Sequence, residues 1–169
     1  MDRYVLGSAG CKTDVDQRWS VLDIKLWVYM DDHKKPMATS PAVHLLVNTL
    51  YMKQCFPYYA LSLLAGLNVE RRGDVSSYNA IDAIGLFKRT PFSVSGSVQA
   101  FLILLMDNVI SHKSRLDARH NFPAEEGAHI VKDAFLKAGE KDICMGDTVE
   151  TMIITTDGIW TKVFQLKLD

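Results

Sequence analysis

Two places along the chain hold residues that could act as nucleophiles. Ser95 lies in the small-residue segment 92–97, between an expected strand and an expected helix, which is where an α/β-hydrolase carries its nucleophilic serine. The glycines of the G-x-S-x-G motif are absent there, so a tight turn whose hydroxyl caps the next helix is the simpler interpretation. Cys144 could use His129 as its base. No spacing rule links this pair, and a buried structural cysteine is the simpler interpretation there as well.

Metal and phosphate sites require residue patterns that the sequence does not contain. The five histidines include no H-x-x-x-H pair, and the three cysteines include no C-x-x-C pair. Asp14-x-Asp16 and the segment 31–33 lack the glycine and the distal glutamate of a calcium-binding loop. Neither G-x-x-x-x-G-K-S/T nor G-x-G-x-x-G occurs. We therefore expect no metal and no other cofactor.

The composition is that of a folded protein with a single domain over residues 1–169. The 169 residues are 48% hydrophobic, and 19 Lys and Arg against 20 Asp and Glu give a net charge of −1. A near-zero charge argues against a dedicated nucleic-acid or membrane-surface role. No apolar run approaches the ~20 residues of a membrane span, and the N-terminus lacks the pattern of a signal peptide. With three widely spaced cysteines, we expect a soluble protein in a reducing, intracellular compartment.

The first half of the chain predicts two helices followed by strands. Apolar residues recur at helical spacing within 16–29. Ser40-Pro41 is typical of a helix start, and this second helix should continue to about residue 55. Strands are expected over 58–67, 75–81 and, as a short third strand, 92–94.

The second half predicts two helices and a hairpin. One helix is expected over 98–109, followed by a mostly irregular segment to residue 123, and a clearer helix over 124–139. Two β-branched runs, 148–156 and 159–168, flank Asp157-Gly158, which is typical of a tight hairpin turn. Grouped helices and grouped hairpins favour an α+β fold with helices over its sheets.

Several segments, in the same order along the chain, resemble the proteasome β-subunit family. The longest are 125–135, 138–147 and 149–159, and the upstream ones are 56–59, 65–67, 81–85 and 104–108. The Phe-Pro-Tyr-Tyr stretch at 56–59 and the Met-Gly-Asp stretch at 145–147 are most similar to the subunit at the sixth position of the β ring. The resemblance covers essentially the whole chain.

This resemblance implies an N-terminal-nucleophile hydrolase fold, which is a four-layer α-β-β-α sandwich. It implies assembly into the β ring of the 20S core particle, with other β subunits, α-ring subunits and the opposite β ring as partners. The implied process is ubiquitin-dependent protein degradation in the cytoplasm and nucleus. Neither nucleic acid nor a membrane is an expected partner.

The resemblance also implies that the chain has no peptidase activity of its own. Active members use an N-terminal threonine together with a lysine and an aspartate from early strands. Residues 4–10 resemble the family's third strand, so we expect a chain without the catalytic hairpin: either an incomplete version of a longer subunit, or one with a gap beside residues 5–10 in the ring. The family's active-site support is represented by Ser95, Asp142 and Met145, and Met145 stands where the family has serine. The subunit at the sixth position is itself non-catalytic.

One segment is expected to serve a neighbouring active site. In this family the sixth β subunit forms a wall of the substrate channel of the adjacent chymotrypsin-like subunit, and the matching residues are Ile81, Asp82 and Ala83. The hypothesis is that Asp82 accepts a hydrogen bond from bound peptide, and the alternative is that it only caps its own turn. Two other classes stay open: a free-standing hydrolase that uses Ser95 or Cys144, and a sandwich-type binding module.

Overall fold

The computed structural model describes residues 4–67, 75–90, 92–111, 123–143, 145–146, 148–155 and 158–166. The chain forms two units, Met1–Ser95 with Ile154–Gly158, and Gly96–Ile153 with Ile159–Asp169. The described residues contain four α-helices and two sheets, which confirms the expected α+β class.

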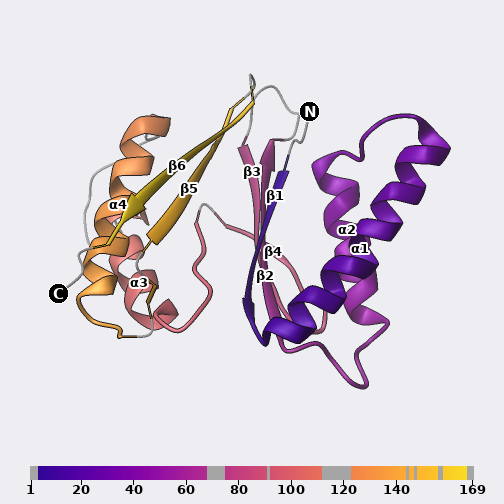
Figure 1. Cartoon of the computed structure of the whole chain (residues 1–169), viewed down its shortest axis with the longest axis horizontal. Coiled ribbons are helices and arrows are strands. Elements are labelled where there is room, and N and C mark those ends of the chain that lie inside the picture. The colour runs from indigo at the N-terminus through magenta and orange to yellow at the C-terminus, as the bar shows by residue number, and fades with distance from the viewer. Residues whose placement is uncertain are drawn as a thin grey trace. The chain divides into compact units, whose positions relative to one another are not determined.

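The sheet of the first unit has four antiparallel strands in the order β1-β2-β3-β4 (Figure 1). The strands are β1 Tyr4–Gly10, β2 Ala60–Leu67, β3 Val75–Ile81 and β4 Lys88–Arg89. β1 pairs with β2 along its whole length, from Tyr4 opposite Gly66 to Gly10 opposite Ala60. β1 and β4 are therefore the edges of the described sheet.

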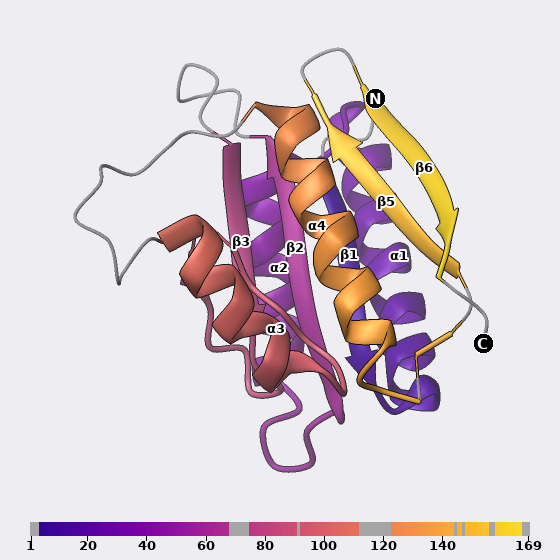
Figure 2. The ribbon, with the colours of Figure 1, turned by 90° about the vertical axis from the view of Figure 1, so that its left-hand side faces the viewer.

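Two helices, α1 Lys12–His33 and α2 Thr39–Tyr51, cover one face of this sheet (Figure 2). The core between them and the strands consists of Leu22, Val43, Leu46, Leu50, Tyr58, Ala60, Leu64 and Ile81. Burying these side chains is the main favourable contribution to folding, roughly 1.5–3 kcal/mol for each large one.

The turn between β1 and α1 is held by the loop that precedes β2. Gly10 has a φ of +127°, and a Cβ at this position would lie 2.3 Å from the carbonyl oxygen of Tyr59, so the close approach requires glycine. The N–H of Cys11 donates to that same oxygen at 2.8 Å. In return, the N–H of Tyr59 donates to Oδ2 of Asp14 at 2.9 Å. These bonds fix the angle at which α1 leaves the sheet.

A charged residue, Arg18, is fully buried between α1 and the sheet. Its Nη1 donates to the Ser62 hydroxyl and its Nη2 to the Ser8 hydroxyl. Ser8 and Ser62 are paired residues of β1 and β2, so one guanidinium joins the helix to both strands. The Arg18 Nε has no hydrogen-bond partner among the described residues. Burial lowers the pKa of the Arg18 guanidinium, because desolvation disfavours its charged form.

The second unit contains two helices that contact each other and a two-stranded sheet (Figure 1). Its elements are α3 Gln99–Met106, a π-helical turn Asp107–Ser111, α4 Ala124–Gly139, β5 Thr148–Ile154 and β6 Ile159–Gln165. The buried apolar residues in the described part of this unit are Leu102, Met106, Ala134, Ala138, Val149 and Leu166. Leu166 follows β6 and packs within 3.5 Å of the position that a Cβ on Gly139 would take, which joins the hairpin to the end of α4.

Most expected elements are confirmed, and α4 and β3 have the expected bounds. The helix expected over 16–29 is longer at both ends, and the one expected to reach residue 55 begins at Thr39 and ends at Tyr51. β2 begins at Ala60 rather than residue 58, and β5 and β6 end at Ile154 and Gln165. Asp157 lies outside the described residues, so its turn type stays a prediction. None of the described helices combines the length and the apolar character needed to cross a bilayer.

The strand expected over 92–94 is wrong. These residues adopt no regular structure, and the sheet ends instead with β4 at Lys88–Arg89. The Thr90 hydroxyl donates to the carbonyl oxygen of Phe92 at 2.7 Å, a local bond of the kind that competes with strand pairing. The helix expected over 98–109 is α-helical only to Met106, after which it continues as the π-helical turn.

Candidate functional site

Asp82 begins a closed turn at the end of β3. Ile81, the last residue of the strand, is buried, whereas the Asp82 side chain is exposed. The N–H of Asp82 donates to the carbonyl oxygen of Leu86, and the N–H of Gly85 donates to the carbonyl oxygen of Asp82, both at 2.9 Å. Oδ1 of Asp82 accepts the N–H of Ala83 at 2.7 Å. One carboxylate oxygen therefore caps the turn while the group as a whole stays open to solvent.

The turn is held against α2. Gly85 has a φ of +90°, which favours glycine, and a Cβ there would lie 2.7 Å from the carbonyl oxygen of Val47 and 3.5 Å from the backbone nitrogen of Tyr51. Strand β3 on one side and α2 on the other thus fix where Asp82 stands in the first unit.

Exposed apolar side chains accompany Asp82. Ile84 and Leu86, on the same turn, are 50% and 76% exposed, and Tyr51 of α2, whose backbone lies against Gly85, is 56% exposed. A carboxylate among exposed apolar groups is typical of a surface that contacts another protein. We call Tyr51, Asp82, Ile84 and Leu86 the Asp82 surface.

In the second unit, Asp142 joins two loops. Its Oδ2 accepts the Ser97 hydroxyl at 2.7 Å, its N–H donates to the carbonyl oxygen of Ala138 at 3.0 Å, and its own carbonyl oxygen accepts the N–H of Met145 at 3.3 Å. The carboxylate thus connects the turn before α3 to the turn after α4. The sequence interpretation grouped Asp142 and Met145 with Ser95, but the hydroxyl that Asp142 binds is that of Ser97.

Ser95 belongs to the first unit, and its Oγ is buried with no hydrogen-bond partner among the described residues. A nucleophilic serine needs a base within hydrogen-bond reach, so the described geometry argues against Ser95 as a nucleophile. Cys144, the other candidate, lies outside the described residues. Within the part of the chain that the structure describes, no three His, Cys, Asp or Glu side chains gather where they could hold a metal ion.

Comparison with known proteins identifies the family. No protein-family model matches the chain. It is 36% identical over 173 residues to a proteasome subunit beta type-1 from Arabidopsis thaliana, a match that covers 99% of the chain and 76% of the relative. The beta type-1 subunit from Dictyostelium discoideum is 32% identical, with 99% and 70% covered, and a probable proteasome subunit beta type-6 from Schizosaccharomyces pombe is 30% identical, with 99% and 77% covered. The chain therefore belongs to the proteasome β-subunit family, among its beta type-1 members.

Proposed function

We propose that the chain is a structural, non-catalytic β subunit of the 20S proteasome core particle. The observation that carries the proposal is the similarity to beta type-1 subunits over 99% of the chain. Residues 1–169 would belong to one β-type domain of the four-layer α-β-β-α sandwich. The two helices over one face of an antiparallel sheet in the first unit agree with half of such a sandwich (Figure 2).

The lack of catalytic activity is supported by the groups at the family's active-site support positions. Asp142 bonds to Ser97 and to the neighbouring backbone, which is a structural use of its carboxylate. Met145 replaces the family's serine and removes a hydroxyl from that position. The proposed subunit would therefore contribute to peptide cleavage only by supporting the active sites of neighbouring subunits.

Assembly with other proteasome subunits is supported by the outer face of α1. Ile24, Trp27 and Val28 are 65%, 66% and 54% exposed, on the side of the helix opposite the buried Leu22. A helix with apolar residues on both faces buries the second face against a partner. Other β subunits, the α ring and the opposite β ring are the proposed partners, in the cytoplasm and nucleus.

The Asp82 surface is the proposed contact with a neighbouring active site. Oδ1 of Asp82 is engaged by Ala83, and the exposed carboxylate still has lone pairs for a backbone N–H of a peptide bound by the adjacent chymotrypsin-like subunit. Ala83 would complete this part of the channel wall, and Ile81, whose side chain is buried in the core, would support the turn from beneath. A charge-assisted bond of this kind is roughly twice as strong as a neutral one.

The test is peptide cleavage at the chymotrypsin-like site of particles carrying Asp82→Ala, Asp82→Asn or, as a control at another exposed aspartate, Asp32→Ala. Asp82→Asn keeps an acceptor for the Ala83 N–H but removes the charge. A channel role predicts a KM raised about tenfold in Asp82→Ala and by a smaller factor in Asp82→Asn, with the control unchanged. If Asp82→Asn behaves as the parent chain does, Asp82 only caps its turn.

The alternative, a free-standing hydrolase that uses Ser95 or Cys144, predicts different behaviour. Such an enzyme would elute as a monomer or small oligomer and react with a fluorophosphonate or an epoxyketone probe. The proposed subunit should elute with a very large complex and stay unmodified by both probes. A modified chain of its own size would overturn the assignment.

A further inference from the structure

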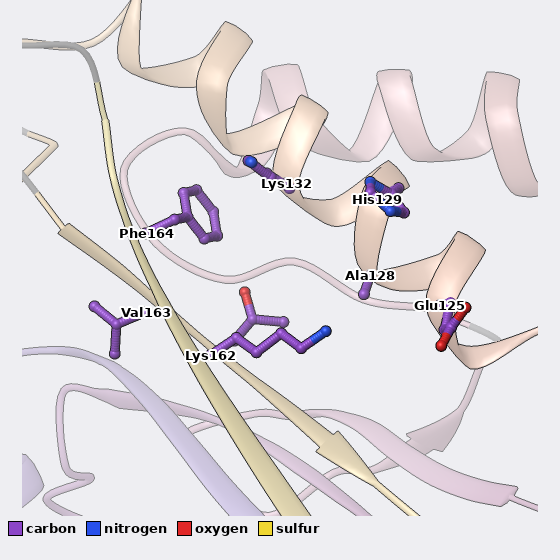
Figure 3. Close-up of a pocket in the computed structure, with 8 residues that line it drawn as sticks. Glu125, Ala128, His129, Lys132, Lys162, Val163 and Phe164 are labelled. Carbon is purple, nitrogen blue, oxygen red and sulfur yellow. The ribbon is translucent and has the colours of Figure 1, made fainter.

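A pocket of about 460 Å³ lies between α4 and the β5–β6 hairpin, wholly within the second unit (Figure 3). Its polar and aromatic lining comes from Glu125, His129 and Lys132 of α4, Thr151 of β5, and Lys162 and Phe164 of β6. A volume of this size is within the range of small-molecule sites, roughly 300–1,000 Å³. None of these residues takes part in the proposed assembly role.

The secondary structure brings these side chains together. Glu125, His129 and Lys132 are spaced by four and three residues, which places them on one face of α4. Lys162 and Phe164 are two residues apart on β6 and therefore share one side of the strand. Figure 3 shows both of them directed toward α4, with Val163 directed away.

The charge of the lining is positive. Two lysines face one glutamate, and neither lysine forms an ion pair with the described carboxylates. The Lys132 ammonium lies 5.6 Å from the centre of the Phe164 ring, a cation–π contact that holds the charge at the pocket wall. An anion in this pocket would meet two ammonium donors.

Thr151 supplies an independent observation. Its Oγ1 is buried and has no hydrogen-bond partner among the described residues, although the residue lines this pocket. Because this oxygen is almost inaccessible in the unliganded structure, an anion would reach the hydroxyl only after the side chain rotates toward the pocket, and that bond would satisfy a group whose unpartnered burial costs roughly 1–3 kcal/mol. A hydroxyl can donate to an anion, and the adjacent lysines favour one.

We propose that this pocket binds a small organic anion, a carboxylate or phosphate carried on a compact apolar group. The anionic oxygens would accept hydrogen bonds from Lys132, Lys162 and the Thr151 hydroxyl, and the apolar group would pack against Phe164. Among the described lining residues, Glu125 is the one carboxylate, and it opposes the ligand's charge. The site is separate from the Asp82 surface, and its function does not depend on peptide cleavage by any neighbour.

The proposal is tested by calorimetric titration of the full chain with benzoate and phenyl phosphate, against benzamide as a neutral molecule of similar shape. At least one anion should bind, and more tightly than benzamide; the two anions distinguish a carboxylate ligand from a phosphate ligand. Lys132→Gln and Lys162→Gln should each weaken that binding about tenfold. Lys137→Gln, on α4 but outside the lining, is the matched control and should leave it unchanged.

Two further substitutions give effects of predicted sign. Glu125→Gln should tighten anion binding, because it removes the opposing charge. Thr151→Val should weaken it severalfold, yet leave the unliganded chain at least as stable, because it removes an unpartnered hydroxyl. The proposal would be overturned if neither anion bound more tightly than benzamide, or if Lys162→Gln left the binding of the preferred anion unchanged.

Discussion

The positive charge of Arg18 rests on two serine hydroxyls in the described structure rather than on a carboxylate. An arginine stays protonated at neutral pH even when burial lowers its pKa. Each hydroxyl that is removed therefore leaves part of a charged group in the core without a partner. The stability of α1 on the sheet depends on Ser8 and Ser62 because of the residue between them.

We predict that Ser62→Ala lowers the free energy of unfolding by about 1–3 kcal/mol, because Nη1 of Arg18 loses its acceptor. In an Arg18→Met background the same substitution should cost nothing, since no charge then needs the hydroxyl. Chemical denaturation of the four chains measures this double-mutant cycle. Ser20→Ala, which removes an exposed hydroxyl from α1, is the control and should stay within about 0.5 kcal/mol of the parent. Additive effects would refute the coupling.

Alanine substitutions at the two serines beside Gly96 should have different effects on the stability of the chain. Ser97→Ala removes the bond to Asp142 and should cost about 0.5–1.5 kcal/mol. Ser95→Ala removes a buried hydroxyl without a partner among the described residues and should leave stability unchanged or raised. Thermal unfolding of both variants checks the contrast, and a larger loss for Ser95→Ala would contradict it.

At the residue scale, the sequence indicates which residues are important more reliably than it indicates which side chains they bind. It draws attention to Asp142 and to the 92–97 turn, but a choice between Ser95 and Ser97 depends on which hydroxyl the tertiary structure brings to the carboxylate. Arg18 carries no signal at all, because a lone arginine on an amphipathic helix is ordinarily exposed. Its burial depends on two serines at positions 8 and 62, whose pairing the local pattern cannot reveal.

At the scale of elements, the turn that carries Asp82 depends on glycine. Gly85→Ala combines a φ of +90° with a Cβ 2.7 Å from the Val47 carbonyl oxygen, so we predict a loss of about 2–5 kcal/mol. Gly96→Ala is the matched control, because Gly96 has a φ of +126° but open space around it, and it should cost only about 1–3 kcal/mol. Equal losses in denaturant unfolding would show that the contact with α2 is relaxed at little cost.

Elements with a strong period are predicted well, and those decided by single hydrogen bonds are not. The helix over 124–139 has the expected bounds because its apolar residues repeat at helical spacing. The strand over 75–81 has no single apolar period, and its expected bounds come from the charged, glycine-containing segment 70–74 before it and from Asp82 after it. The strand expected over 92–94 fails because the bond from Thr90 to Phe92 is local. The π-helical turn after Met106 has no sequence signal, since one residue more per turn changes spacing without changing composition.

At the scale of the whole molecule, α1 has apolar residues on two faces, and only one of these faces packs on the sheet of the first unit. We predict that Trp27→Glu prevents the chain from entering a large complex, because Trp27 is 66% exposed between Ile24 and Val28. The isolated chain should keep its unfolding midpoint, since no buried contact is lost. Native gel electrophoresis of tagged chains measures incorporation.

Lys35→Gln, which lowers the net charge by the same single unit at an exposed residue just beyond α1, is the control and should be incorporated normally. If Trp27→Glu were incorporated normally, the outer face of α1 would not be an assembly contact. The family to which the chain belongs would not be affected by that result. Loss of both variants would indicate a general sensitivity to negative charge rather than a contact at Trp27.

The position of β1 at the edge of the described sheet has a consequence for the amount of the chain that is made. Its seven residues, Tyr4–Gly10, carry neither a charge nor a proline, the usual protections of an open edge. A copy made in excess of its partners would present that edge to other copies and pair with them. Making this chain in step with its partner subunits would therefore limit the pairing of open edges between copies.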